Sequence, residues 1–244
     1  MHSWHLRCIP RTEQFQHVTD SRLRMEVQTP EGISAPVAIA SGLDGFGNLV
    51  QFGCIEQPHT GLSIVSEGKV SQMPYRICGT AHGMFASGTP LTMADSSIER
   101  FVRHVLKESC AEKKAEELAQ TLHNAMTYAP GTTNVKTTAA QAFSAKKGVC
   151  QDYAHILIAM LRSAGIPARY ACGFLTGEGA THAWVEYFHK GVWLALDPTN
   201  GHIPDGGLIK VAHGRDSADC AVTRGVFTGR TSQHDTLSIK VERL

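Results

Sequence analysis

The chain has 244 residues and a formal net charge of +1, from 23 lysines and arginines against 22 aspartates and glutamates. At about 150 residues per domain, this length predicts one large domain or two small ones. Apolar residues make up 42% of the chain and charged residues 18%, which is typical of a globular protein and excludes disorder throughout. The balanced charge provides no bulk positive field, so we expect neither a nucleic-acid partner nor a membrane partner.

The cysteine count and the first residues indicate where the protein works. Seven cysteines are present, an odd number, and no two form a Cys-x-x-Cys pair. This pattern predicts reduced thiols in a cytoplasmic protein rather than a disulfide framework. The first thirty residues contain no unbroken apolar segment, so we expect no secretory signal. The most apolar run, Ile156 to Leu161, is too short to span a bilayer.

The first part of the chain is predicted to be rich in β-strands. Residues Ser21 to Val27 alternate between apolar and charged side chains, which is the period of a half-buried strand. The glycine-rich segment Asp44 to Asn48 is typical of a turn. Two more strands are expected at Leu49–Ile55 and Gly61–Val70. We therefore expect an N-terminal β-rich region over residues 1–85.

The second part, residues 86–244, is predicted to contain helices followed by strands. A helix capped by Asp95 or Ser96 should run through Val105. Three more helices are expected at 111–126, 138–145 and 150–164. Strands are expected at 168–174, 182–188, 192–196, 208–212 and 237–241, with a hairpin turn at 189–191. Helices followed by strands are typical of an α+β fold.

Cys150 stands at the start of the most apolar helix. A thiol at a helix N-terminus faces unpaired N–H groups and the positive end of the helix dipole, which favour thiolate over thiol. A buried, unreactive cysteine is the common alternative, and we expect it for the other six cysteines.

His182 and Asp197 complete a possible set of three catalytic groups. His182 begins one predicted strand, and Asp197 ends the next. If the two strands pair through a turn near Lys190, His182 and Asp197 fall opposite each other, where a carboxylate can reach an imidazole nitrogen. The helix that carries Cys150 then needs only to pack on that sheet to align a nucleophile, a base and an orienting acid.

Several segments of the second part resemble the transglutaminase-like superfamily, and most closely its bacterial branch of candidate cysteine proteases. The matching motifs run from about Leu91 to the C-terminus, and they are Gly148–His155, Gly165–Tyr170, Thr181–Trp184, Leu196–Gly201, Gly214–Asp219 and Arg224–Gly229. The resemblance implies that Cys150 is the nucleophile, His182 the base and acid, and Asp197 the orienting group. It also implies a papain-like α+β core, with the nucleophile's helix packed on an antiparallel sheet, after a β-rich N-terminal region.

Other residues have weaker signals. Asp152 complements the helix dipole or acts in catalysis, His155 packs in the core, and Trp184 is expected to form a wall of the cleft. The oxyanion of an acyl-transfer reaction would be bound by the Cys150 N–H and by a side-chain donor, with Gln141 and Tyr128 as candidates. Asp216 and Asp219, in a later loop, either brace the site or form a turn.

No metal or cofactor is expected. His2, His5 and Cys8 are evenly spaced, but they would alternate between the faces of a strand, and no fourth ligand follows. No phosphate loop or dinucleotide fingerprint is present. No dense carboxylate loop of the calcium-binding kind is visible either.

These observations predict a metal-independent thiol enzyme that acts on a peptide or protein amide through a thioester. Hydrolysis, as in a cysteine protease or amidase, is favoured over transfer to an amine, as in a transglutaminase. A non-enzymatic binding module on the same fold is the third alternative. The sequence does not indicate the substrate or the oligomeric state.

Overall fold

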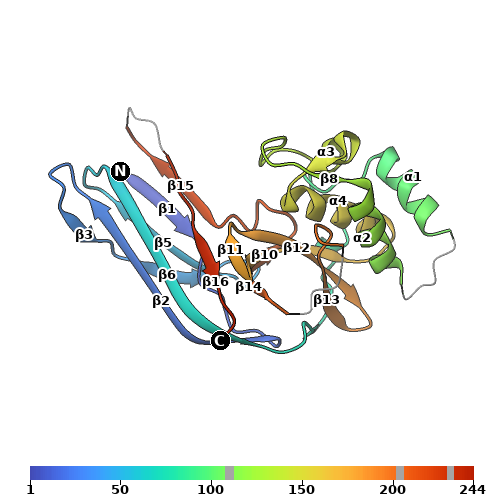
Figure 1. Cartoon of the computed structure of the whole chain (residues 1–244), viewed down its shortest axis with the longest axis horizontal. Coiled ribbons are helices and arrows are strands. Elements are labelled where there is room, and N and C mark those ends of the chain that lie inside the picture. Colours follow the sequence, from blue (N-terminus) through green and yellow to red (C-terminus); the bar gives the residue numbers. More distant parts are fainter. Residues whose placement is uncertain (108–112, 202–205, 230–233) are drawn as a thin grey trace.

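The structure is a computed structural model that describes residues 1–107, 113–201, 206–229 and 234–244. A five-stranded sheet lies in the middle of the molecule, with the helices on one side and the N-terminal strands on the other (Figure 1). The spatial order of this central sheet is β14-β10-β12-β13-β7, and all neighbouring strands are antiparallel. Its strands are β7 (Ile77–Cys78), β10 (Ala168–Leu175), β12 (His182–His189), β13 (Val192–Leu196) and β14 (Leu208–Gly214).

Four α-helices follow the N-terminal strands, close to the predicted positions. They are α1 (Ser96–Val105), α2 (Lys114–Ala125), α3 (Ala139–Ala145) and α4 (Cys150–Ser163). Asp95 caps α1, since its side chain accepts from the N–H groups of Ser97 and Ile98. The first residues expected in the second helix, Ala111 and Glu112, lie outside the described residues. None of the described helices combines the length and the apolar character needed to cross a membrane.

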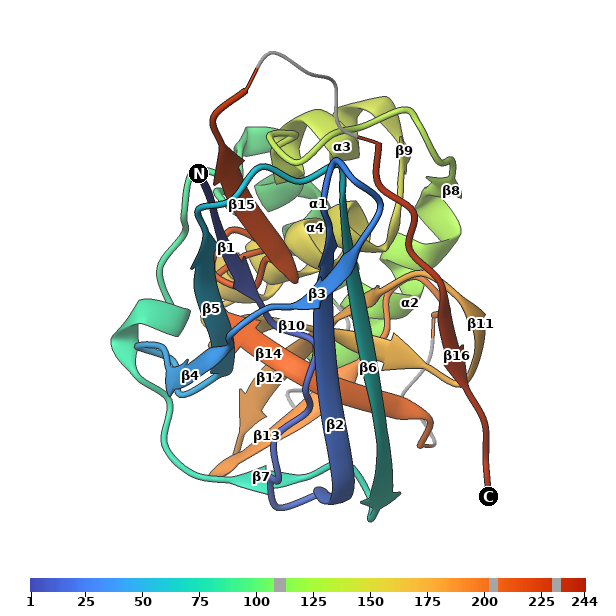
Figure 2. The ribbon, with the colours of Figure 1, turned by 90° about the vertical axis from the view of Figure 1, so that its left-hand side faces the viewer.

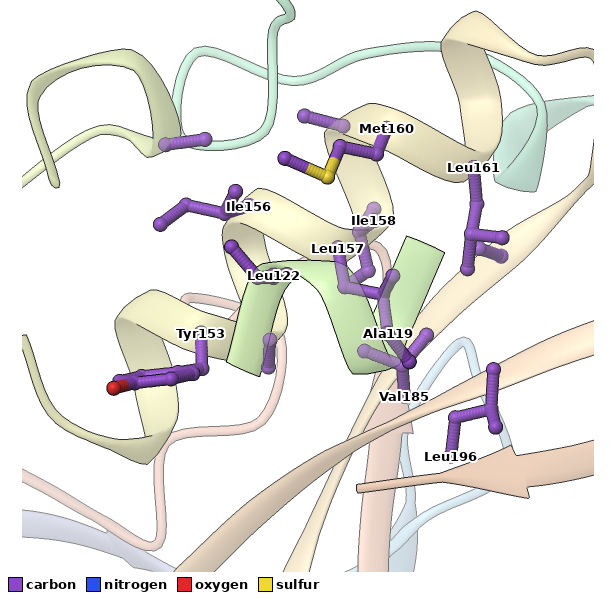
Figure 3. Packing of buried hydrophobic residues seen from close by; sticks show 14 of the residues in the cluster. Ala119, Leu122, Tyr153, Ile156, Leu157, Ile158, Met160, Leu161, Val185 and Leu196 are labelled. Carbon is purple, nitrogen blue, oxygen red and sulfur yellow. The ribbon is translucent and has the colours of Figure 1, made fainter. Parts of the chain in front are cut away.

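Helix α4 is the centre of the hydrophobic core. Eleven of its fourteen residues are buried, because the other three helices and the central sheet surround it. Figure 3 shows side chains of α4 against α2, and against Val185 and Leu196 of the sheet. Burial on nearly all sides explains why this helix is apolar all round rather than amphipathic. The surrounding packing fixes the position of its first residue, Cys150.

The N-terminal strands form two sheets that enclose a second, smaller core (Figure 2). One sheet has the order β15-β1-β5-β4, and the other has the order β3-β2-β6. These strands are β1 (His2–Leu6), β2 (Gln16–Gln28), β3 (Ser34–Pro36), β4 (Ala40–Leu43), β5 (Leu49–Ile55), β6 (Gly61–Gln72) and β15 (Thr223–Phe227). The β-rich character expected of this region is therefore confirmed.

Two strands cross the expected division at residue 85. Strand β7 precedes it but adds to the edge of the central sheet, next to β13. Strand β15 comes from the far end of the chain but pairs with β1. The two parts of the chain therefore contribute strands to each other.

The remaining short elements precede α4, β12 and α1 in the chain or pair with the strands that do. Strand β8 (Thr127–Tyr128) pairs in parallel with β9 (Lys147–Gly148), directly before α4. Strand β11 (Gly177–Gly179) pairs with β16 (Ile239–Val241), near the C-terminus. A single 3-10 turn, η1 (Gly83–Phe85), leads toward α1.

Candidate active site

Cys150 is the first residue of α4, and its side chain is partly exposed. The preceding residue, Val149, is extended, with φ −111° and ψ −179°, so the chain turns into the helix at the thiol. Asp152, in the first turn, accepts a hydrogen bond from the Val149 N–H at 2.8 Å. This contact satisfies one of the N–H groups that a helix start leaves free.

The hairpin of β12 and β13 brings His182 and Asp197 together. Nε2 of His182 and Oδ2 of Asp197 are 2.7 Å apart, and the side chains are 11% and 2% exposed. Both oxygens of Asp197 are fully engaged. Oδ1 accepts from the N–H groups of Thr199 and Asn200, and Oδ2 accepts from Nδ2 of Asn200 at 2.8 Å. The carboxylate is therefore held rigidly against the imidazole.

The pairing of these strands differs from the one expected. The structure pairs His189 with Val192 and Val185 with Leu196, so the two-residue turn consists of Lys190 and Gly191. Both turn residues have positive φ, 46° and 85°, as in the type I′ turns that suit hairpins. The hairpin turn is confirmed, but the expectation that His182 lies directly opposite Asp197 is wrong.

The contact survives this shift because the two residues are diagonal neighbours. Continuing the register beyond Leu196 places Asp197 opposite Trp184, two residues after His182. Residues two apart on a strand share a face, and diagonal pairs stay within reach of long side chains. A carboxylate and an imidazole can therefore meet across the diagonal.

The side chain of Cys150 lies near His182, close enough to influence the protonation of the imidazole. Burial lowers the pKa of His182, but the hydrogen bond to Asp197 and the neighbouring Cys150, together with the charges of both groups, raise it to about 9. For Asp197, burial raises the pKa, and the hydrogen bond and charge of His182 more than offset this and hold it below its usual value. The structure thus pairs His182 with Asp197 and places Cys150 near the imidazole.

Asp152 has a structural position beneath the thiol. It is 1% exposed, and its Oδ2 also accepts from Oγ1 of Thr133 at 2.7 Å. A side chain at Gly148 would collide with it, because a Cβ there would lie 2.6 Å from the Asp152 Cβ. Asp152 therefore fixes the start of α4 rather than pointing at His182.

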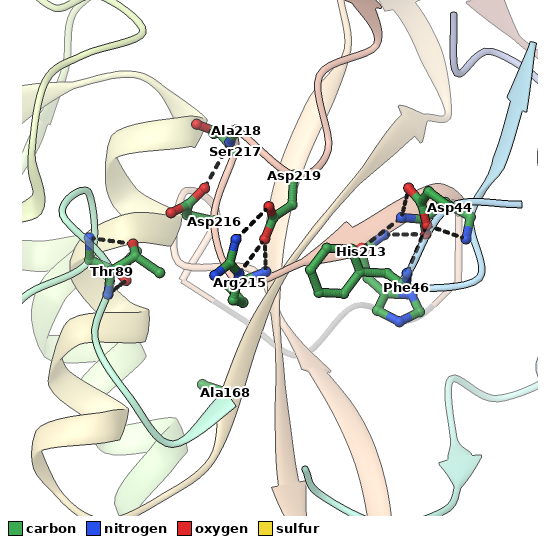
Figure 4. A network of polar contacts seen from close by, with 12 residues as sticks. Asp44, Phe46, Thr89, Ala168, His213, Arg215, Asp216, Ser217, Ala218 and Asp219 are labelled. Atoms are coloured by element: carbon green, nitrogen blue, oxygen red, sulfur yellow. Dashed lines mark hydrogen bonds and ion pairs between the residues drawn. The ribbon is translucent and has the colours of Figure 1, made fainter. Parts of the chain in front are cut away.

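His155, within α4, contacts the loop that carries Asp216 and Asp219. Nε2 of the buried His155 accepts from the Ser217 N–H at 3.1 Å, and burial lowers the pKa of His155 to about 4. The carboxylates of Asp216 and Asp219 bond within their own loop, to the Ala218 N–H and to Arg215 (Figure 4). These bonds are those of a turn, not of residues that brace the active site.

The two candidate oxyanion donors have different surroundings. Gln141 is occupied at the start of α3, where its side chain accepts from the Thr138 N–H at 3.0 Å. Tyr128 lies across the β8–β9 pair from Gly148, and its side chain is 53% exposed. Burial and the nearby Cys150 raise the pKa of Tyr128, so the phenol stays protonated and able to donate. Of the two, Tyr128 is the one that lies near Cys150.

The sequence analysis did not single out Asn200, although its backbone N–H and its side chain both donate to the carboxylate of Asp197. The signal was available, because an asparagine three residues after an aspartate in a turn can bond back to it. It also missed the contacts of Trp184, whose indole N–H donates to Tyr75 at 3.1 Å. No local sequence pattern could predict this contact, because Tyr75 and Trp184 are far apart in the chain.

Metal-binding side chains do not gather at this site. Among the described residues, no group of three or more histidine, cysteine, aspartate or glutamate side chains could hold a metal ion. His2 contacts His59, at 3.1 Å between Nδ1 and Nε2. Cys8 packs into the N-terminal core instead.

Two family models match the chain and together span both of its regions. Residues 99–198 match the transglutaminase-like superfamily, and residues 2–71 match the bacterial transglutaminase-like N-terminal region. The chain therefore has a transglutaminase-like core and a bacterial transglutaminase-like N-terminal region. The core match includes Cys150, His182 and Asp197, and the resemblance drawn from the sequence motifs is confirmed.

A solved structure shares this fold, and several proteins are similar to the chain in sequence. A candidate cysteine protease of Cytophaga hutchinsonii has a TM-score of 0.78 over 100% of this chain and 87% of that chain, at 23% identity. This likeness confirms the expected fold class, a transglutaminase-like core with an N-terminal β-rich region. An uncharacterised protein of Mycobacterium leprae is 29% identical over 226 residues, covering 83% of this chain and 81% of its own. A protein-glutamine gamma-glutamyltransferase of Pseudomonas aeruginosa is 37% identical over 76 residues, which is 26% of this chain and 11% of that protein.

Proposed function

We propose that the protein is a thiol-dependent acyl-transfer enzyme, and specifically a cysteine protease or amidase that hydrolyses amide bonds in peptides or proteins. The observation that carries the proposal is the pair of His182 and the buried Asp197, with 2.7 Å between Nε2 and Oδ2, beside Cys150 at the start of α4. Nucleophile, base and orienting acid in hydrogen-bonding sequence are the requirement for covalent acyl transfer.

The geometry assigns a role to each nitrogen of His182. Nε2 faces Asp197, so a proton on Nε2 is donated to the carboxylate, and Nδ1 is left for the thiol. Nδ1 accepts the proton of Cys150, and the thiolate attacks the carbonyl carbon of the substrate amide. The oxyanion is bound by the Cys150 N–H and, on the position described above, by the phenol of Tyr128.

Collapse of this intermediate breaks the C–N bond. The proton on Nδ1 of His182 passes to the leaving amine, and a thioester remains on Cys150. Nδ1 then accepts a proton from the incoming water, which attacks the thioester and releases a carboxylic acid and the free thiol. An amine that replaces water would give a new amide by the same steps, so the choice of acceptor separates a protease from a transglutaminase.

Transfer to an amine is the second candidate, and the Pseudomonas aeruginosa glutamyltransferase among the relatives favours it. A direct test incubates the protein with a library of peptides and amides in heavy-oxygen water that contains a primary amine. Hydrolysis places heavy oxygen in the product acid, whereas transfer gives an amine adduct, and mass spectrometry distinguishes them. We expect acids that contain heavy oxygen as the main product. If neither product forms, the proposed enzyme activity is rejected, and a non-enzymatic binding module is the remaining alternative.

The pH dependence of turnover should report His182. Because its pKa is raised to about 9, the imidazolium persists at neutral pH, and kcat/KM should fall as pH rises through about 9. Asp197→Asn removes the charge that raises this pKa, so the alkaline limb should move to lower pH. A pH–rate profile measures both, with Asp20→Asn, at an exposed position on β2, as the control. An alkaline limb that stays in place in Asp197→Asn would argue against the His182–Asp197 pair.

Turnover should survive a metal chelator. All the roles in the proposed steps are filled by side chains and backbone N–H groups of the chain itself. We expect kcat/KM in EDTA to equal that in buffer, with no gain from added calcium or zinc. Loss of activity in EDTA that is restored by one added metal would overturn the proposed mechanism.

A reducing compartment such as the cytoplasm suits this chemistry. The six cysteines that the structure describes are all free thiols. They include Cys172 and Cys220, which are buried side by side, with the Cys172 thiol donating to the Cys220 carbonyl at 3.4 Å. Thiol chemistry of the kind proposed for Cys150 is maintained in a reducing environment.

A further inference from the structure

One side of β12 connects the active site to the N-terminal region. Side chains alternate along this strand, so Ala183 and Val185 pack toward α4 while Trp184 and Glu186 face the opposite side. Trp184 is fully buried, and its ring lies nearly parallel to that of His182, at 22° and 6.4 Å between centroids.

We propose that Tyr75, from the segment between β6 and β7, is a positioning residue that orients His182 through Trp184. The proposal rests on the proposed function and gives the N-terminal region a role in it. Tyr75 does not touch the reacting groups. It holds the indole plane against which the imidazole and its carboxylate are placed.

Tyr75 is held by two ring contacts and two hydrogen bonds. Its ring stacks on Phe15 of the N-terminal region, at 3.8 Å between centroids, and meets Trp184 edge-on. Its hydroxyl donates to the carboxylate of Glu186 and accepts from the Trp184 N–H. Burial, followed by the charge of Glu186, raises the pKa of Tyr75 well above its usual value, so the phenol keeps the proton that it donates.

Glu186 is in turn fixed by buried cations. Arg169 forms an ion pair with it, and Nζ of Lys210 lies 2.8 Å from its Oε1. Lys210 also contacts Glu13 of the N-terminal region, at 3.0 Å. A buried polar network in which all members are satisfied is rigid, and removing one member leaves a neighbour unpaired at high cost.

The imidazole needs such support because its ring torsion is soft. Rotation about the bond between Cβ and the ring has only broad, twofold preferences, and Asp197 constrains just one edge of the ring. A flat indole beside the ring narrows the remaining freedom. The register strengthens this argument, since continuing it past Leu196 places Trp184 opposite Asp197 and two residues from His182, so the indole is a neighbour of both members of the pair.

Tyr75→Phe in the full chain isolates the hydroxyl, because it keeps the ring that stacks on Phe15. NMR titration of the His182 imidazole is the main readout, and it does not require activity. We expect the pKa of His182 to move from about 9 toward the ordinary value of about 6.5, because its bond to Asp197 loosens. We also expect kcat to fall about ten- to a hundredfold at unchanged KM, as small misplacements of a catalytic group do.

Val27→Ala is the matched control, since Val27 is fully buried in the N-terminal core and belongs to a cluster that excludes Trp184. It should lower the melting temperature without moving the pKa of His182. If Tyr75→Phe does not fold, Trp184→Phe is the alternative variant, because it removes the donor of the hydrogen bond between the indole and the Tyr75 hydroxyl. It should shift the pKa of His182 in the same direction.

The outcomes separate the two proposals. An unchanged pKa in Tyr75→Phe, or an equal shift in Val27→Ala, would overturn the positioning role. A shifted pKa in a protein whose wild type shows no thiol-dependent turnover would uphold the positioning role and reject the proposed function.

Discussion

Replacing Cys150 by serine should abolish amide turnover, by at least about three orders of magnitude in kcat/KM, while the protein stays folded. A hydroxyl is a far weaker nucleophile than a thiolate. Only one atom changes at a partly exposed position, so the melting temperature should stay close to that of the wild type. Steady-state kinetics and circular dichroism measure both quantities.

Cys54→Ser and Cys78→Ser are matched controls, because both thiols are exposed and lie away from His182. Both variants should keep wild-type turnover. Iodoacetamide mapping at pH 6 adds a second readout, in which Cys150 should be modified first. Cys220 should be slow, since burial raises the pKa of its thiol well above the usual value. Faster modification of Cys54 or Cys220 would contradict the assignment of the nucleophile.

Asp197→Asn should lower kcat/KM by roughly one to three orders of magnitude, by analogy with the serine-protease exchange, which costs about four. In the present structure Oδ1 of Asp197 accepts two backbone N–H groups, so the oxygen of an asparagine would remain there. Its NH₂ group would then face Nε2 of His182. To accept from it, His182 must move its proton to Nδ1, which is the nitrogen that has to accept the proton of Cys150.

Asp152→Asn supplies the comparison at the other buried aspartate. The asparagine oxygen can keep the hydrogen bonds from Val149 and Thr133, so the change removes mainly a charge at the helix start. Such charges contribute about 0.3–1 kcal/mol, and up to about 2 kcal/mol where partly buried, and they act mainly on folding. Turnover should therefore fall much less than in Asp197→Asn. Near-wild-type turnover in Asp197→Asn would leave a dyad of Cys150 and His182.

Local patterns were sufficient to predict the helices and the hairpin. Asp95 as a cap, glycine at the turn and the apolar α4 are all encoded within a few residues, and the structure agrees with each of them. The predicted register between β12 and β13 was wrong, because the prediction centred the turn near Lys190. The type I′ turn requires Lys190 and Gly191 as its two central residues.

The elements that the sequence did not reveal depend on distant partners. Strand β1 contributes Trp4 and Leu6 to the N-terminal core, but its short alternation becomes a strand only between β5 and β15. Likewise, Glu186 and Lys210 sit at strand positions that local reasoning assigns to apolar residues. Their burial depends on cations, a phenol and a carboxylate from elsewhere in the chain.

The thioester on Cys150 is the central claim, and acid-quenched mass spectrometry tests it most directly. The protein is mixed with an activated acyl ester, quenched within a single turnover and digested, and the acylated peptide is identified. The account predicts an acyl group on Cys150 in the wild type and none in Cys150→Ser, with slower loss of the acyl group in Asp197→Asn. An acyl group found on another cysteine, or an unacylated Cys150 during substrate turnover, would contradict it.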